Sequence, residues 1–191
     1  MTEELPEIPD VPLRDDADDF FPTHVYEALG IDPRGYAERI GGAVMVVAKQ
    51  PEGGPLVMMT SGVSRLPTES GERVELAVEV SEDQQGAGWV ALEIVCNDIA
   101  MNRRVPPVGV PWVNSEPIFT DTAITAIMVT ESRWGAEFDE VRGEHGEIVG
   151  HVRTLRLLTG AEAELAAAEG FAAVVDQAGS LDALIDVERG K

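Results

Sequence analysis

Apolar and polar residues alternate along residues 74–80, so successive side chains are expected to point to opposite faces of a sheet. One face would carry three valines and a leucine, and the other would carry two glutamates and an alanine. A period of two over β-favouring residues predicts a half-buried strand. The apolar run at residues 56–59 predicts a second strand, which ends in a turn at residues 60–64. We expect the two strands to pair antiparallel at the centre of a sheet.

Further strands are predicted on both sides of this pair. Residues 43–49 are apolar, and the Pro- and Gly-rich residues 51–55 predict a turn, so the first three strands should form a meander. Residues 123–129 are apolar on both faces, which is typical of a central strand covered from both sides. Two strands, 137–142 and 147–158, flank a glycine-containing turn and predict a hairpin.

Helical signals separate these strands. Residues 24–29 predict a short helix with Thr23 as its N-cap and Gly30 at its end. A further helical turn is expected after residues 32–33, where proline takes its preferred first position. Apolar residues within 86–101 recur at helical spacing, which predicts a helix packed flat on the sheet.

The C-terminal part of the chain carries a helix-capping signal. Thr159 and Glu162 have the spacing of a capping box, in which each side chain binds the backbone N–H of the other residue. They predict the start of an alanine-rich helix. Gly170 predicts a break or a close contact, because glycine destabilises a helix by about 1 kcal/mol relative to alanine. The expected buried stripe of this helix consists of Leu165, Ala168, Phe171 (or Ala172) and Val175.

Residues 105–117 contain four prolines and predict an irregular loop. Trp112 in this loop could anchor a partner protein or fold back as a lid over the core. We expect the lid, because large aromatic side chains rarely stay exposed. The single cysteine, Cys96, lies in the apolar 86–101 segment and is expected to be a reduced core thiol.

The order of helix, three strands, helix, strand, hairpin and helix favours an α/β fold of the α+β type, with helices packed on the faces of a mixed sheet. The 191 residues fit one domain, which we assign to residues 23–191. Residues 1–22 hold eight acids, one arginine and four prolines. We expect a mobile, solvated leader, with a partner-binding tail as the alternative, and expect residues 20–21, both phenylalanine, to dock on the domain.

The formal net charge is −21, from 35 acidic and 14 basic residues. Such a charge opposes binding to phosphate backbones and anionic membranes, and it steers basic partners toward the chain. No apolar run approaches the roughly 18–20 residues of a membrane span, and the acidic N-terminus does not resemble a signal peptide. We therefore expect a cytoplasmic protein that binds neither nucleic acid nor membranes. Acidity that serves solubility alone is the alternative.

No catalytic or metal-binding constellation is evident. The three histidines lack the spacing of a zinc-binding pair, and one cysteine cannot complete a thiolate site. Ser61 and Ser64 follow a predicted strand, but neither has glycine both two positions before and two positions after it, as a nucleophile elbow requires. The acidic residues of the 74–80 strand and of the C-terminal helix are interpreted as solvated faces. The sequence predicts no cofactor, no metal and no enzymatic activity.

Three short motifs resemble the Suppressor of fused-like domain family. That family has a strand ending in a T-x-G-hydrophobic-S turn, a strand with an ELA or ELL core, and a late strand that runs into a T-x-x-E helix followed by glycine. The segments VMMTSGVS, GERVELAVEV and LRLLTGAEAELAAAEG occur here in that order, and the resemblance spans residues 23–185. The matching residues, to which it assigns structural roles, are Thr60, Gly62, Ser64, Glu75, Leu76, Thr159, Glu162 and Gly170.

The resemblance implies a mixed-sheet α/β fold, no catalytic residues and a protein-binding role. The animal member of the family binds Gli-type transcription factors as a negative regulator, and bacterial relatives are proposed to be immunity proteins that neutralise toxins. An acidic surface suits the second role, because many toxin nuclease domains are basic. The implied partner is thus another protein, such as a basic toxin domain. Two alternatives stay open, namely an acidic regulator that mimics nucleic acid and a hydrolase that uses Ser61 or Ser64.

Overall fold

The computed structural model describes residue 14 and residues 18–30, 38–40, 44–50 and 54–190. Within these residues the strands form one sheet in the order β1-β2-β3-β4-β8-β6-β5, with β7 beside β8. The β4–β8 pair is parallel and the other pairs are antiparallel, so the sheet is mixed, as predicted. The strands are β1 (Glu38–Ile40), β2 (Val44–Lys49), β3 (Leu56–Ser61), β4 (Val74–Val80), β5 (Pro111–Val113), β6 (Ile124–Thr130), β7 (Glu140–Arg142) and β8 (Ile148–Thr159).

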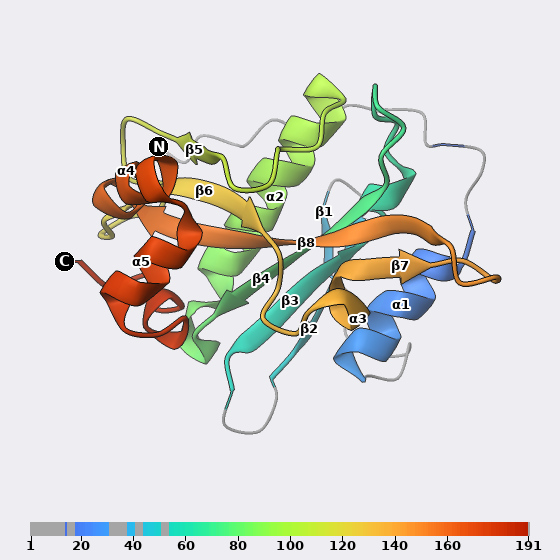
Figure 1. The fold of residues 1–191 in the computed structure, drawn as a ribbon, viewed down its shortest axis with the longest axis horizontal. Helices are drawn as coiled ribbons and strands as arrows, with labels where there is room; N and C mark the ends of the chain where they lie inside the picture. The colour runs from blue at the N-terminus through green and yellow to red at the C-terminus, as the bar shows by residue number, and fades with distance from the viewer. Residues whose placement is uncertain (1–13, 15–17, 31–37, 41–43, 51–53, 191) are drawn as a thin grey trace.

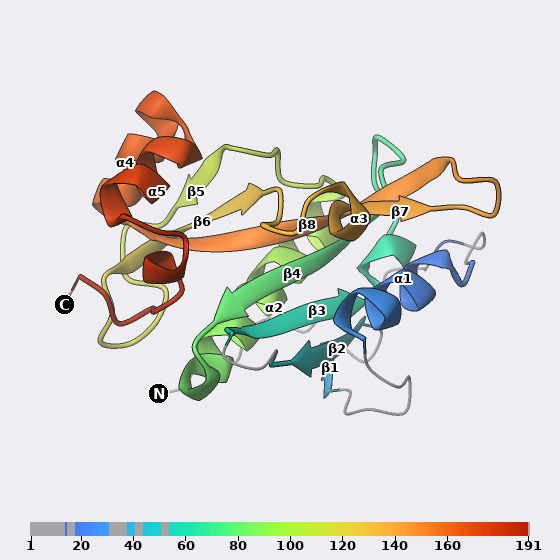
Figure 2. The same cartoon turned by 60° about the horizontal axis from the view of Figure 1, so that its bottom comes forward.

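Helices cover both faces of the sheet (Figure 1). The helices are α1 (Phe20–Leu29), α2 (Gln85–Asn102), α3 (Ala136–Asp139), α4 (Gly160–Glu169) and α5 (Phe171–Ala178), with short 3-10 helices η1 (Val63–Arg65), η2 (Glu82–Gln84) and η3 (Asp182–Leu184). α2 packs on one face, and α1, α3, α4 and α5 pack on the opposite face. Figure 2 shows that α4 and α5 lie at one end of that face and α1 at the other.

The main core lies between α2 and the sheet. Leu92 and Cys96 of α2 are fully buried against the valines of β4. Burial, together with the negative charges of Glu75 and Glu93, raises the pKa of the Cys96 thiol well above its ordinary value. The predicted 86–101 helix and its buried, reduced cysteine are both confirmed.

The β4 strand is enclosed on both faces, so the prediction of a half-buried strand is wrong. All seven of its residues are buried, because α2 covers one face while α1 and α3 contribute to the cover on the other. Glu79 is 5% exposed, and Arg133 Nε lies 2.8 Å from one of its carboxylate oxygens. Arg156 is ion-paired to the other oxygen. Glu79 therefore faces two guanidinium groups instead of solvent, which corrects its interpretation as part of a solvated face.

This ionic group divides the α1 side of the sheet into two apolar clusters, one under α1 and α3 and one under α4 and α5. The guanidinium of Arg156 lies 5.7 Å from the centre of the Phe171 ring at the start of α5. Burial lowers the pKa of Arg156, and the charge of Glu79 opposes that shift. Arg133 also reaches Asp182, at 2.6 Å, so the network connects the sheet to the C-terminal segment.

Helix α1 begins earlier than predicted. It starts at Phe20 with Asp19 at the N-cap position, so the predicted N-cap at Thr23 is wrong. Phe21 is fully buried among residues of β3 and β8, which confirms the docking of the aromatic pair and favours the longer helix. The helix therefore begins within the 1–22 segment. The predicted helical turn after residues 32–33 lies outside the described residues. Gly30, with φ of 58°, ends the helix as predicted.

The predicted meander and hairpin are confirmed, with two differences in detail. β2, β3 and β4 are antiparallel neighbours, and β7 pairs with β8. The expected strand at 137–142 begins as α3 and becomes β7 only at Glu140. The expected irregular loop at 105–117 contains β5, which pairs with β6 as the last strand of the sheet. A proline is tolerated in such an edge strand because its missing N–H is not needed there.

The capping box at the start of α4 is confirmed. Thr159 Oγ1 accepts a hydrogen bond from the Glu162 N–H at 3.3 Å, and the Glu162 carboxylate accepts one from the Thr159 N–H at 2.8 Å. Gly170, with φ of 89°, separates α4 from α5. Leu165, Phe171 and Val175 of the predicted stripe are partly buried against the apolar cluster under α4 and α5, as expected. Ala168 is exposed because the break changes the direction of the helix. The most buried residues of the two helices are Ala163, Ala166 and Val174, which the prediction did not include.

Candidate functional site

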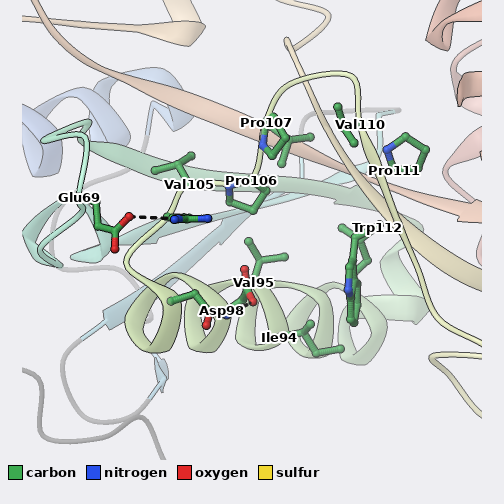
Figure 3. Close-up of a pocket in the computed structure, with 14 residues that line it drawn as sticks. Glu69, Ile94, Val95, Asp98, Val105, Pro106, Pro107, Val110, Pro111 and Trp112 are labelled. Atoms are coloured by element: carbon green, nitrogen blue, oxygen red, sulfur yellow. Dashed lines mark hydrogen bonds and ion pairs between the residues drawn. The ribbon is translucent and has the colours of Figure 1, made fainter.

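An open apolar groove of about 680 Å³ runs between α2 and residues 105–113. Figure 3 shows Ile94, Val95 and Asp98 on the helix, with Trp112 facing them from the opposite wall. That wall consists of Val105, Pro106, Pro107, Val110, Pro111 and Trp112.

Backbone hydrogen bonds hold the 105–113 segment in place. α2 is followed by Arg103 in a left-handed conformation (φ 54°), and the carbonyl of Arg103 accepts a hydrogen bond from the Glu69 N–H at 2.8 Å. The Gly109 N–H donates to the Val129 carbonyl at 2.8 Å, and β5 then pairs with β6. The prolines restrict the backbone further, because each has a fixed φ. The wall of the groove is therefore largely preformed.

The groove opens onto an exposed apolar patch. Trp112 is 53% exposed, so the expectation that it closes over the core as a lid is wrong. β5 is the last strand of the sheet, and its register places Trp112 beside Ile127, so no further strand covers the ring. Contiguous exposed apolar residues are typical of interaction surfaces. The patch consists of Val110 and Trp112 in the groove wall, and Met101, Val108 and Val113 in the neighbouring sequence are exposed as well.

Glu69 lies at one end of the groove, and Asp98 lies on α2 beside Val95 (Figure 3). Arg104 Nε lies 3.1 Å from a carboxylate oxygen of Glu69. Because both side chains are well exposed, we expect this pair to stabilise the fold by no more than about 1 kcal/mol. Asp98 accepts a hydrogen bond from the Asn102 side chain at 2.7 Å. The groove can thus bind apolar groups on its floor and either sign of charge at its rim.

The edge of β5 offers little for backbone recognition. The strand is three residues long, and Pro111 has no N–H to donate. Short edge strands that contain proline resist the addition of a further strand. The groove is therefore better suited to recognise side chains than to extend the sheet.

The residues of the first two sequence motifs lie together where β3, η1 and β4 meet. Thr60 Oγ1 donates to the Glu75 carboxylate at 2.6 Å and accepts a hydrogen bond from the Leu76 N–H at 2.8 Å. The same carboxylate accepts hydrogen bonds from the N–H groups of residues 62–64, that is Gly62, Val63 and Ser64, at 2.9 to 3.2 Å. Glu75 is fully buried, which corrects its interpretation as solvated. None of these residues lines the groove.

The third motif lies at the start of α4, also outside the groove. Arg189 Nη2 is 2.9 Å from the Glu162 carboxylate, which adds an ion pair to the capping box. Burial opposes ionisation of Glu162, but hydrogen bonds from Arg189 and Thr159 outweigh it and lower the pKa of this carboxyl. Glu162 is therefore not part of a solvated face. Gly170 provides the break between α4 and α5.

The geometry does not favour a serine nucleophile. Ser64 is 3% exposed, so a substrate has no access to its hydroxyl. Ser61 lies at the end of β3. A serine nucleophile needs a base, and Nε2 of the histidine His24 is instead 2.8 Å from the Phe138 carbonyl oxygen. Within the described residues, His, Cys, Asp and Glu side chains do not gather in threes as a metal site would need. No helix in this part of the chain has the length and apolar character to span a membrane.

A second cavity, of about 790 Å³, lies between α1, α3 and the neighbouring strands. Its lining includes Trp134 and Phe138, whose ring centroids are 4.6 Å apart, together with Glu27, Glu137 and Lys49. Because charged side chains make up a larger share of its lining than of the groove's, this cavity is less suited to an apolar ligand. Trp134 is 41% exposed and serves below as a control for Trp112.

Comparison with known proteins identifies the family. The sequence profile of the family described as Suppressor of fused protein (SUFU) matches residues 37–190. The chain belongs to the SUFU family. The resemblance carried by the three motifs is thereby confirmed, and so is the mixed-sheet α/β fold. No curated protein is similar enough in sequence to count as a relative of this SUFU-family chain.

Solved structures of SUFU proteins have the same fold. A chain of the Sufu–Fu complex is 11% identical with a TM-score of 0.63, and the match covers 88% of each chain. A SUFU homologue from Neisseria gonorrhoeae is 14% identical with a TM-score of 0.61, covering 91% of this chain and 94% of the other. Drosophila Suppressor of Fused is 11% identical with a TM-score of 0.62, and the match covers 88% of this chain but 49% of that one. The chain thus spans about half of the Drosophila protein's length.

The groove itself could not be found from the sequence. Its lining comes from α2, residues 105–113 and β6, and these segments become neighbours only in the folded chain. The sequence does hold one indication of an interaction surface. In residues 105–113, valines and Trp112 alternate with prolines and a glycine, and the apolar residues follow neither a helical nor a strand period. Apolar residues that no period assigns to a core are candidates for an interaction surface.

Proposed function

We propose that this SUFU-family chain is a non-enzymatic protein-binding domain and that its groove receives an apolar segment of the partner. The supporting observation is the half-exposed Trp112 in a preformed apolar groove. Tryptophan is among the residues that contribute most to binding energy in protein interfaces. Interfaces also have an apolar centre and a polar rim. Here Ile94 and Val95 supply part of the centre, and Glu69 and Arg104 lie at the rim.

The partner in this proposal is a basic protein. The net charge of −21 would attract such a partner and repel nucleic acid and anionic membranes. In its finer form, the proposal assigns the chain a cytoplasmic toxin-immunity role, with residues 23–191 as the domain that binds and neutralises a basic toxin domain. Family membership and acidity support this role. One similar structure, the Sufu–Fu complex, is a complex of a relative with another protein.

The test compares groove variants with matched variants elsewhere on the surface. Full-length tagged chain is used to capture protein partners from lysate of its own organism, and the recovered partner is quantified. Trp112→Ala and Val110→Asp should lower recovery at least tenfold, because loss of a hot-spot residue costs about 2 kcal/mol or more. Trp134→Ala and Ile148→Asp alter exposed apolar residues outside the groove and should leave recovery unchanged.

Circular dichroism of all four variants establishes that each one is folded. Equal losses in groove and control variants would contradict the groove as the binding site, and repeated failure to recover any protein would contradict the binding function. For the immunity role, co-expression of the chain with a captured toxin should protect cells. Trp112→Ala should abolish that protection while Trp134→Ala preserves it.

A further inference from the structure

Residues 5–13 of the leader have a three-residue repeat that is independent of their acidity. They read Leu-Pro-Glu-Ile-Pro-Asp-Val-Pro-Leu, so an aliphatic residue followed by proline occurs three times, and an acid follows the first two of these pairs. A polyproline II helix has three residues per turn, so in that conformation each residue type would occupy its own edge. The aliphatic edge would be Leu5, Ile8 and Val11, and the acidic edge Glu7 and Asp10.

The chain enters the described structure close to the groove. The Arg14 N–H donates to the Arg65 carbonyl at 2.9 Å, and the Arg14 guanidinium donates to the Gly71 carbonyl at 3.3 Å. The two acceptors lie at either end of a loop that includes Glu69. Glu69 lines the groove, and its N–H donates to the carbonyl of Arg103 at the end of α2. The leader is thus tethered one loop away from the charged end of the groove.

A shallow cavity of about 410 Å³ connects this loop to the groove. The two share Glu69, Arg104 and residues 105–107 in their linings. Along α2 the groove runs from Ile94 to Asn102, which is about 12 Å at 1.5 Å per residue. Nine residues in a polyproline II helix extend about 28 Å at 3.1 Å per residue. Residues 5–13 are therefore long enough to cross the shallow cavity and follow the groove.

Charge complementarity at this entrance favours the leader as occupant. Three arginines, Arg103, Arg104 and Arg153, line the shallow cavity together with Glu69 and Glu72. Arg104 and Arg153 are paired with these two carboxylates, and within the described residues the Arg103 side chain has no ion pair or hydrogen bond, so it supplies the uncompensated positive charge. The acidic edge of the leader would pass the Arg103 guanidinium while its aliphatic edge faces Trp112. An untethered acidic peptide would be repelled by the chain's net charge. A short tether gives the leader a millimolar effective concentration, so even a weak affinity is sufficient.

We propose that residues 5–13 bind in the groove of their own molecule as a polyproline II segment, with the aliphatic edge against Trp112. Aromatic-lined grooves recognise proline-rich segments of this kind in other proteins. The bound leader would occupy the groove until a partner displaces it. This last, regulatory part rests on the proposed function, whereas the docking of the leader does not.

Paramagnetic broadening in the full-length chain tests the docking. A nitroxide label is attached at Glu7→Cys, and Cys96 does not react because it is fully buried. The indole N–H signal of Trp112 should be lost from the NMR spectrum while that of Trp134, at the second cavity, is retained. Adding Ile8→Asp and Val11→Asp should restore the Trp112 signal, because carboxylates do not enter an apolar groove.

Matched controls give the opposite outcomes. Glu3→Gln and Glu4→Gln, outside the repeat, should leave the broadening of Trp112 unchanged. A mixture of labelled unenriched chain and unlabelled isotope-enriched chain should show no broadening, since docking is intramolecular. The proposal is overturned if the Trp112 signal persists, if both indole signals broaden equally, if the mixture broadens Trp112, or if the Ile8→Asp and Val11→Asp chain behaves like its parent.

The regulatory part is tested by capturing the partner with unlabelled chains. The Ile8→Asp and Val11→Asp chain should recover several-fold more partner than the wild type at limiting concentration, because a vacant groove removes the competition. Equal or lower recovery would overturn the regulation. If the Trp112 signal of the labelled chain persists but a partner is captured, the docking is refuted and the proposed function stands. Broadening without any partner would refute the proposed function alone.

Discussion

One carboxylate, that of Glu75, binds the whole turn between β3 and η1. It accepts hydrogen bonds from Thr60 Oγ1 and from three successive backbone N–H groups at residues 62–64. Gly62 in this turn has φ of 134°, a conformation that side chains beyond glycine rarely adopt. The glutamate and the glycine thus act together, since the glycine allows the bend that aims the N–H groups at the carboxylate.

Replacing Glu75 by alanine should therefore destabilise the fold strongly. Three backbone N–H groups and the Thr60 hydroxyl would lose their acceptor in a buried site, and each such group costs about 1–3 kcal/mol. We expect Glu75→Ala to lower the free energy of unfolding, measured in urea, by about 3 kcal/mol or more. Glu164→Ala, at an exposed position of α4, should change it by less than about 0.5 kcal/mol. Similar values for the two variants would contradict this role of Glu75.

Among the elements, α4 is held in position by β8, which directly precedes it in the chain, and by the C-terminal segment, which lies against it in space. The capping box begins the helix directly at the end of β8. Arg189 then donates to the Glu162 carboxylate and to the Leu157 carbonyl. Glu162 thus fixes the start of the helix and holds the C-terminal segment against the sheet.

The stabilisation from Glu162 should depend on pH. Its pKa is lower in the folded chain than in the unfolded one, so its contribution is present above the unfolded value of about 4.3 and is lost as pH falls through the folded value. We expect Glu162→Gln to lower the thermal midpoint at pH 7 and to differ less from the wild type as pH falls below about 4. Glu164→Gln, exposed on the same helix, should show no such trend. A constant Glu162→Gln effect down to pH 3 would exclude the ionised carboxylate as its cause.

The elements with a clear period could be predicted from sequence, and the way they cover one another could not. The alternation of residues 74–80, the helical spacing of 86–101 and the capping box each describe local geometry, and all three are present. That β4 is buried on both faces depends on α1 and α3, which come from distant parts of the chain. The groove likewise depends on contacts between distant parts of the chain, because its lining from α2, β5 and β6 is brought together only when the sheet has formed.

On the scale of the whole molecule, the charge acts on stability and on binding with opposite signs. A net charge of −21 on a chain of 191 residues repels itself and opposes the compact state. The same charge would draw in the basic partner of the proposed function. Salt separates the two effects. Mobile ions screen both, so they weaken the self-repulsion that destabilises the fold and also weaken the attraction that favours partner binding.

Raising the ionic strength from 0.01 to 0.15 M shortens the screening length from about 30 Å to about 8 Å. The thermal midpoint of the isolated chain should therefore rise over this range, since self-repulsion weakens, while its affinity for a basic partner, measured by titration calorimetry, should fall. The buried Glu79–Arg156 pair changes little with salt because it is shielded from solvent, so it does not reverse the trend in stability. A midpoint that falls with salt would show that exposed ion pairs outweigh the net repulsion. An affinity unaffected by salt would mean that the apolar groove alone drives recognition and that the acidity serves only solubility.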